Sequence, residues 1–333
     1  MLYLKREANV FFIFLIAIFL VINAKSSSAT ECGSVPVDNC DITQNTTFTQ
    51  GNYSLPNGIN IRASNIVLDC NGSILNGTKA FNSYGIESNG DYDDNLITDC
   101  TVMNYDVGIF LRGGDYNGPD RDKILGNILE YNDDGIYMLT KVRYSEVSKN
   151  TIQNNYEKGI HLGFSNYVEF NKIWNNNFIN NTLQAYDLGY GGVINYWNSS
   201  GQGNYWNNYD SEAEGCEDNN SDLSCDIPYN ISGGTEGKDY LPSTGVQILS
   251  ILPIQVVEDV DMVKGKTTLV RATMENVGLI DKNITVELYF EDNLKSSENE
   301  TINAGQEKDV DLWFVPDIAG NNKEIKIEIM GNN

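Results

Sequence analysis

Histidine is almost absent from this 333-residue chain, since His161 is the only one. A single imidazole excludes metal sites built from several histidines. Basic residues are also scarce: 22 Lys and Arg against 46 Asp and Glu give a net charge of −24, without a basic cluster. We therefore expect no nucleic-acid partner, because nucleic-acid-binding surfaces are basic. The acidity favours a solvated extracellular surface that meets divalent cations or neutral glycans.

Long apolar runs are also absent, except for one between Val10 and Ile22. Lys5 and Arg6 precede this run and small residues follow it up to Ala29, which is the order of a secretory signal peptide. Thirteen apolar residues are short for a membrane span. We predict a signal peptide at residues 1–30, with an uncleaved anchor as the alternative. No stable membrane span is expected after its removal.

The cysteine count agrees with export from the cytoplasm. Six cysteines, an even number, predict a set of disulfides in an oxidising compartment. Ten N-x-[ST] sequons fit a secreted or cell-surface glycoprotein, although many arise by chance in so Asn-rich a chain.

A repeated unit occupies the first two thirds of the chain. Gly-Ile pairs begin at Gly85, Gly108, Gly135 and Gly159, at spacings of 23, 27 and 24 residues. The apolar residues that follow each glycine alternate with other residues, which is the period of a β-strand. A strand in so short a unit cannot bury one face alone, so successive units stack in parallel about 4.8 Å apart. The repeat predicts an all-β protein built on a parallel β-helix, a solenoid.

Alignment on the Gly-Ile pair places residues of successive rungs in columns. The inward apolar column comprises Ile86, Ile109, Ile136 and Ile160. One bend column comprises Cys70, Cys100, Asn127, Asn150 and Asn171. Asparagine suits such a bend because it tolerates left-handed backbone angles and its amide can bond to its copy on the next rung. The rung spacing also puts Cys70 and Cys100 within disulfide range.

An outward column of rings is the first candidate binding surface. The residues two positions after the glycines are Glu87, Phe110, Tyr137 and His161. Exposed rings of Phe110, Tyr137 and His161 could stack on sugar rings. The alternative is an ordinary cross-strand ladder, or a strip covered by the inserted loop at 112–121.

An acidic column is the candidate catalytic face. Asp106, Asp133 and Glu157 each lie two residues before a glycine. Carboxylates on neighbouring or alternate rungs lie about 5 or 10 Å apart, distances that suit glycosidase pairs and calcium coordination. Ordinary solvated turns are the alternative, because acidic residues are common at bends. The chain lacks both the G-H-G with R-I-K pattern of polygalacturonases and the D-P-H pattern of alginate epimerases.

Residues 31–242 resemble the archaeal and bacterial NosD-like right-handed β-helix proteins. The resemblance is carried by NIVLDCNG at 65–72, the Gly-Ile rungs, GNYWNNYD at 203–210 and the downstream Asp226-Ile-Pro-Tyr229. It implies caps at both ends of the solenoid, with Cys32 and Cys40 closing a loop over the first rung. Family resemblance of this kind implies fold more firmly than activity.

The resemblance also draws attention to a capping loop that usually binds calcium. Its oxygen-bearing positions are Asp218, Asn220, Asp222 and Asp226. Leu223 and Cys225 replace two glycines of the usual loop, and closure by a Cys216–Cys225 disulfide would substitute for the ion. We expect no cofactor, with calcium in this loop as the alternative. Copper delivery, implied by the family name alone, is disfavoured because one histidine and paired cysteines leave few soft ligands.

Residues 246–333 follow the linker Pro242-Ser-Thr-Gly245 as a second predicted domain. Short alternating runs separated by turn residues predict a small β-sandwich. KGKTTLVRATMENVG at 264–278 and Asn303-Ala-Gly-Gln306 resemble a CARDB-type, immunoglobulin-like adhesion module. The whole chain is thus interpreted as a secreted or surface β-helix protein, non-catalytic, that contacts surface glycans, polysaccharides or cell-envelope proteins. A polysaccharide lyase or glycoside hydrolase acting on the acidic column is the alternative.

Overall fold

The computed structural model describes residues 30–114, 118–163, 167–189, 194–199, 201–234, 237–255, 264–278, 281–318 and 324–331. The predicted signal peptide lies outside the described residues, apart from Thr30, as does the centre of the inserted loop at 112–121. None of the helices in the described ranges is long and apolar enough to cross a membrane.

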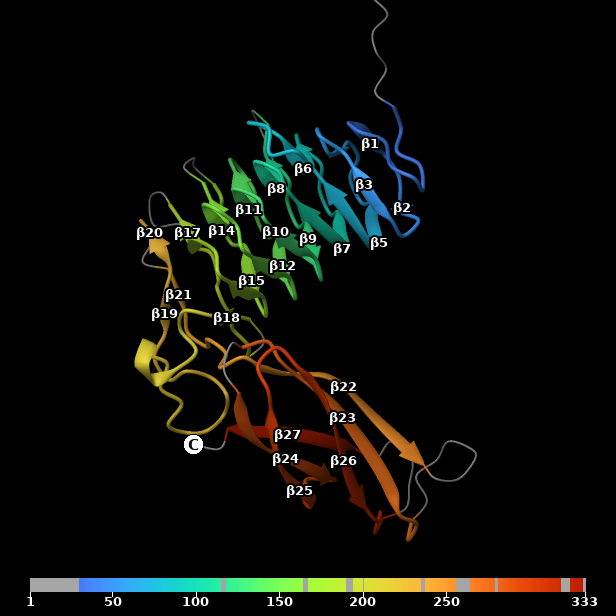
Figure 1. Ribbon diagram of the computed structural model, residues 1–333, viewed down its shortest axis with the longest axis vertical. Coiled ribbons are helices and arrows are strands. Elements are labelled where there is room, and N and C mark those ends of the chain that lie inside the picture. The colour runs from blue at the N-terminus through green and yellow to red at the C-terminus, as the bar shows by residue number, and fades with distance from the viewer. Residues whose placement is uncertain are drawn as a thin grey trace, which may run out of the picture.

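Parallel strands stack rung on rung and confirm the predicted solenoid (Figure 1). One side is a sheet of eight strands: β1 (Cys40–Ile42), β4 (Ile59–Ile61), β6 (Tyr84–Asn89), β8 (Val107–Arg112), β11 (Asp134–Leu139), β14 (Lys158–Leu162), β17 (Leu183–Asp187) and β20 (Ser232–Gly233). Ile86, Ile109, Ile136 and Ile160 pair in register along this sheet and are fully buried. The inward column is therefore confirmed.

Two further sides belong to one continuous sheet, because its long strands β5 and β7 run across the bend between them. Its strands are β2 (Thr46–Thr47), β3 (Asn52–Ser54), β5 (Val67–Asn76), β7 (Leu96–Met103), β9 (Lys123–Leu125), β10 (Ile128–Glu130), β12 (Glu146–Ser148), β13 (Thr151–Gln153), β15 (Lys172–Trp174), β16 (Asn177–Ile179) and β18 (Tyr205–Trp206). A rung thus has three sides and three corners.

The repeated glycines stand where successive rungs approach each other most closely. A Cβ atom on Gly108 would lie 2.5 Å from the carbonyl oxygen of Gly135, and one on Gly135 would lie 2.5 Å from that of Gly159. Such distances are below any ordinary contact, so a side chain at either position would force the rungs apart. The Gly-Ile repeat is therefore a condition of close stacking.

Side-chain amides fill the three corners as ladders. At the first corner Asn127, Asn150, Asn176 and Asn204 each pass an amide hydrogen bond to the next member at 2.9–3.2 Å, and Asp239 accepts the last one. At the second corner Asn132 donates to Asn155, Asn155 to Asn181, and Asn181 to Gln184. Each ladder satisfies polar groups that the packed rungs shut off from water.

The predicted bend column contained one error. Asn171 does not follow Asn150, because Ile173 pairs with Val147 and not with Ile152. Asn171 instead belongs to the third corner, where it accepts from the backbone N–H of Ser145 and donates to Asn195. The apolar-x-x-Asn-x-apolar pattern occurs at two corners of a rung, and the pattern alone does not distinguish them.

The C-terminal end of the solenoid is closed by aromatic residues. Trp206 is fully buried and stacks between Phe178 and Tyr229, at centroid distances of 4.3 and 4.2 Å. The hairpin of β19 (Tyr229–Asn230) and β21 (Lys238–Asp239) and the short 3-10 helix at Glu212–Glu214 complete this cap. The Tyr-Trp and D-x-P-Y motifs thus extend the apolar core by one layer.

Two antiparallel sheets of three strands follow the cap and face each other (Figure 1). One comprises β22 (Val246–Gln255), β23 (Thr268–Asn276) and β26 (Glu307–Phe314), and the other β24 (Lys282–Phe290), β25 (Asn293–Ile302) and β27 (Ile325–Gly331). Their core includes Phe290 and Phe314, whose rings lie 5.3 Å apart. It is separate from the solenoid core. The boundary at 242–246 and the immunoglobulin-like classification stay predictions.

All six cysteines form the expected disulfides, Cys32–Cys40, Cys70–Cys100 and Cys216–Cys225. Cys70 and Cys100 join adjacent rungs with their Cα atoms 4.8 Å apart.

Replacing both Cys70 and Cys100 by Ala should lower the free energy of unfolding by about 3 to 4 kcal/mol, because the bridge closes a loop of some 30 residues in the unfolded chain. The matched Cys32/Cys40 pair closes a much shorter loop, so its removal should cost about 1 kcal/mol less. Denaturant titration measures both losses. Free thiols at Cys70 and Cys100 in a non-reducing peptide map would contradict the pairing.

Asp122 should make stability depend on pH. Burial, opposed by a hydrogen bond from the Asn95 N–H, raises the pKa of this carboxyl from 3.8 to about 8. Its Oδ2 is buried without a partner among the described residues. Between about pH 4 and pH 8 the unfolded chain loses this proton and the native chain keeps it, so the residue lowers stability as pH rises.

Asp122→Asn removes this titration and should raise the free energy of unfolding by a few kcal/mol at pH 7.5 but much less at pH 4.5. Denaturation at both pH values measures the change, with Asp91→Asn on an exposed turn as the control for the charge removed. An equal effect at the two pH values would refute a protonated native Asp122.

Candidate functional site

The outward column of rings lies on the eight-stranded sheet as predicted. Glu87, Phe110, Tyr137, His161 and Tyr186 are register partners on β6, β8, β11, β14 and β17. Tyr84 adds a ring at the start of the row, stacked on Phe110 with centroids 4.4 Å apart. The row is therefore longer than the three residues identified in the sequence.

The faces of these rings are largely turned toward one another. Tyr137 and His161 stack at 4.2 Å with their planes 5° apart, and Phe110 tilts against Tyr137 at 5.5 Å. Phe110 is only 4 % exposed. A sugar ring stacks on an open aromatic face, which Phe110 lacks. The expectation that Phe110 is an exposed platform residue is thus corrected, and a cross-strand ladder describes it better. Glycan contact by Tyr137 and His161, both half-buried, stays a prediction.

The acidic column forms an edge beside this row. Asp106, Asp133 and Glu157 follow one another on successive rungs, because Asp134 N–H bonds to the Asp106 carbonyl and Glu157 N–H to the Asp133 carbonyl. The side chain of Glu157 is 66 % exposed and that of Asp133 is 40 % exposed. Most of the column is therefore open to solvent.

Two lysines that the sequence reasoning missed neutralise part of this charge. Lys79 Nζ lies 2.9 Å from Asp133 Oδ1 and 3.1 Å from the centre of the Tyr156 ring. Lys158 Nζ lies 3.2 Å from Glu157 Oε2 and 3.5 Å from Asp134 Oδ1. Lys79 comes from a loop two rungs away from Asp133, so no spacing in the sequence pointed to it.

Asp134 is the second residue that the sequence reasoning missed. Its Oδ2 lies 2.9 Å from His161 Nδ1, and its side chain is only 10 % exposed. A carboxylate at Nδ1 orients an imidazole, as in catalytic pairs. Here, however, the imidazole stacks on Tyr137. All six cysteines are disulfide-bonded, so none of them can serve as the nucleophile. Asp134 directly precedes the repeated Gly135, a position that could have been tested in the alignment.

Burial raises the pKa of Asp106, and the nearby charges of Asp133, Asp134 and Glu157 add to the rise, while a hydrogen bond from the Asn82 N–H opposes it. The pKa values of Tyr84 and Tyr137 are raised chiefly by burial as well. Asp106 thus differs from Asp133, which is paired with Lys79. Different environments for adjacent carboxyls are a feature of acid–base sites.

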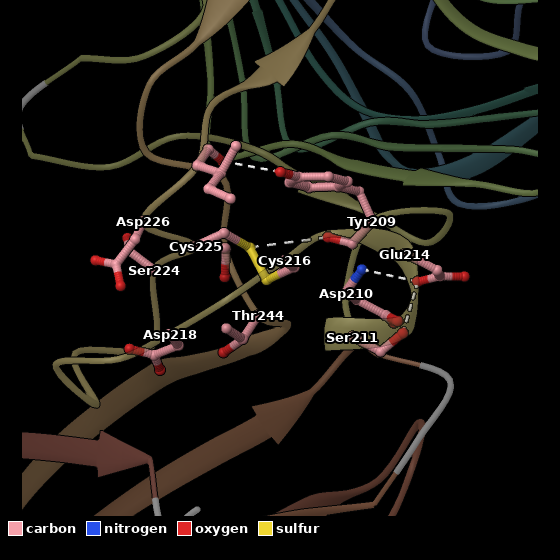
Figure 2. The surroundings of a disulfide bond; sticks show 12 residues. Tyr209, Asp210, Ser211, Glu214, Cys216, Asp218, Ser224, Cys225, Asp226 and Thr244 are labelled. Carbon is pink, nitrogen blue, oxygen red and sulfur yellow. Dashed lines mark hydrogen bonds between the residues drawn. A yellow bond between two sulfur atoms is a disulfide. The ribbon is translucent and has the colours of Figure 1, made fainter.

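The carboxylates of the capping loop accept hydrogen bonds chiefly from the backbone of the loop itself. Asp218 accepts hydrogen bonds from the N–H groups of Asp222 and Leu223, and Asp222 accepts from Ser224 N–H and from the side chain of Asn220. Asp226 is bonded to Asn219. Figure 2 shows Asp218 and Asp226 at separate places around the Cys216–Cys225 disulfide. Calcium in this loop stays an untested alternative, and the disulfide and turn bonds close the loop without it.

Metal donors do not gather elsewhere in the described part of the chain. No group of three His, Cys, Asp or Glu side chains there is arranged to hold a metal ion. The thiols are all bonded to each other, and the imidazole is engaged by Asp134.

Phe110→Ala should lower the free energy of unfolding by about 3 to 5 kcal/mol, because it removes a buried ring from between Tyr84 and Tyr137. Tyr137→Ala, at a half-buried position, should cost less. Thermal and denaturant unfolding measure both. A Phe110→Ala protein of unchanged stability that lost polysaccharide binding would restore the open-platform interpretation.

Comparison with protein families identifies the solenoid. Residues 23–211 match the model of the family described as "Periplasmic copper-binding protein (NosD)". Searches of curated proteins and of solved structures gave no match. The family match covers more than half of the chain and ends within the aromatic cap. With its stacked rungs and Tyr-Trp cap, this chain belongs to the NosD family.

Proposed function

We propose that this chain is a non-catalytic β-helix protein outside the cytoplasm that binds glycans or cell-envelope partners. The family is described as periplasmic, and three disulfides suit an oxidising compartment. An excess of acidic over basic residues favours neutral glycans over anionic partners.

One observation carries the non-catalytic part of the proposal. Three carboxylates of the acidic edge are already paired, Asp133 with Lys79, Glu157 with Lys158 and Asp134 with His161, and only Asp106 has no cationic partner among the described residues. An acid–base pair works when its members converge on a substrate in a site that excludes water. An open edge neutralised by lysines is better suited to solubility and rung pairing.

A polysaccharide lyase or glycoside hydrolase is the second candidate. The raised pKa of Asp106, next to the lysine-paired Asp133, favours it, because glycosidases use one protonated and one ionised carboxyl. The acidic column would then carry the reaction, with Lys79 paired to Asp133.

Copper binding does not fit the donors that the structure describes. Cupric and cuprous sites in proteins use imidazole, thiolate and thioether ligands. The six cysteines are disulfide-bonded, and the single histidine is held by Asp134. Met138 and Met274 are fully buried in separate hydrophobic cores, and the half-buried Met103 and Met330 lie apart, on β7 of the solenoid and β27 of the sandwich. We therefore assign no copper role to the described residues.

The two C-terminal sheets are proposed to serve as a CARDB-type adhesion module. Their support is the resemblance of residues 264–278 and 303–306 together with the antiparallel arrangement of β22–β27. Trp313 on β26 is about half exposed and offers an aromatic contact for a partner.

The mature protein should release no products from pectin, alginate, chitin or neutral glucans, with or without calcium. Reducing-end and unsaturated-product assays test this expectation. If product forms, Asp133→Asn is the decisive variant and Asp222→Asn in the capping loop is its matched control. Activity that is lost in Asp133→Asn and kept in Asp222→Asn would establish the enzyme on the acidic column.

A further inference from the structure

A cavity of about 330 Å³ lies where the solenoid cap meets the C-terminal sheets. Its walls come from the turn between β15 and β16, the cap segment 201–205, the disulfide loop at 222–224, the linker and the sandwich. Figure 2 shows Thr244 of the linker close to a sandwich strand at this junction. Small-molecule sites commonly occupy about 300–1,000 Å³ and favour such junctions between domains.

Contacts between the cap and the sandwich fix the walls of the cavity relative to each other. Lys282 Nζ, from the sandwich, donates to the backbone carbonyl of Asp210 in the cap at 3.0 Å. Gly331 N–H, at the end of β27, donates to Ser221 in the disulfide loop at 3.0 Å. Leu223 of the same loop packs against the sandwich core. Three separate contacts of this kind preorganise the walls, which lowers the cost of binding.

The lining has a polar and an apolar side. Asn175, Asn177 and Gln202 contribute side-chain amides that form no hydrogen bond with any described residue, while Leu223 and Ile329 contribute apolar surface. Tyr205 lies behind this lining, only 2 % exposed, with its hydroxyl donating to Asp210 Oδ2 at 2.6 Å, so it supports the wall and offers no open ring face. Amides that donate and accept, opposite apolar side chains, match a molecule with hydroxyls on its rim and C–H groups on its face.

The charge of the lining residues further restricts the ligands that the cavity can bind. Asp222 is the one ionisable carboxyl among the described lining residues, and no Lys, Arg or His joins it there. Such a site repels carboxylated or phosphorylated ligands and offers nothing to pair with them.

We propose that this cavity binds a neutral pyranose, as a free sugar or as the end of a glycan chain. The proposal rests on the glycan-binding function above and assigns it a site away from the row of rings on the eight-stranded sheet.

Asn177→Phe tests the site by filling it. Asn177 faces outward on β16, and its register partner Thr151 occupies the same position one rung earlier, outside the lining. Thr151→Phe is therefore the matched control for a large ring on this face. Gln202→Ala, at an exposed position, removes one amide and should leave folding intact.

Saturation-transfer NMR and calorimetry with glucose, galactose, mannose and N-acetylglucosamine provide the readout, with galacturonate as the charged comparison. We expect at least one neutral sugar to bind the wild type and Thr151→Phe, tenfold or weaker binding to Asn177→Phe, and about fivefold weaker binding to Gln202→Ala. Galacturonate should bind more weakly than galactose.

Two results would overturn the site: no neutral sugar binds the wild type, or Asn177→Phe and Gln202→Ala both bind as the wild type does. A polysaccharide pull-down separates this failure from that of the proposed function. If polysaccharide is retained equally by wild type and Asn177→Phe, glycan binding stands and the cavity is wrong. If the wild type retains no polysaccharide and binds no sugar, both proposals fail.

Discussion

The structure depends on amide hydrogen bonds that run from rung to rung at the corners of the solenoid. A corner turns the chain within one or two residues and buries backbone groups that no strand can pair. Asn127, Asn150 and Asn176 solve this by accepting from the preceding rung and donating to the next. At the far end Asp239 and Asp187, which only accept, receive the last amide protons of two ladders. The apolar column and the outward row follow from the rung spacing that these ladders maintain.

Local periodicity predicted the parts of the fold that depend only on alternation. Once Gly108 and Gly135 are aligned, period two determines that Ile109 and Ile136 point inward and that Phe110 and Tyr137 point outward. The Cys70–Cys100 bridge followed from the same register. Asn171 was misplaced because its pattern fits two corners equally well, and only pairing between strands separates them.

The candidate site was less predictable, because it depends on side-chain directions and on residues from loops. Alignment found Asp106, Asp133 and Glu157 but could not find Lys79, which reaches Asp133 from two rungs away. Nor could a sequence pattern reveal that Tyr137 and His161 turn their faces to each other. The cavity at the junction is a similar case, since its walls are contributed by six separate segments of the chain.

The linker and the sandwich also affect how copies of this protein can meet. A solenoid that ended at β18 would expose a row of unpaired backbone groups, the kind of edge on which further chains add end to end. Ser243 of the linker pairs with Tyr205 on that strand and also with Ser224 of the disulfide loop. The edge of β18 is therefore paired within the chain, so the segment that connects the two halves of the molecule occupies a place where a strand of another copy could add.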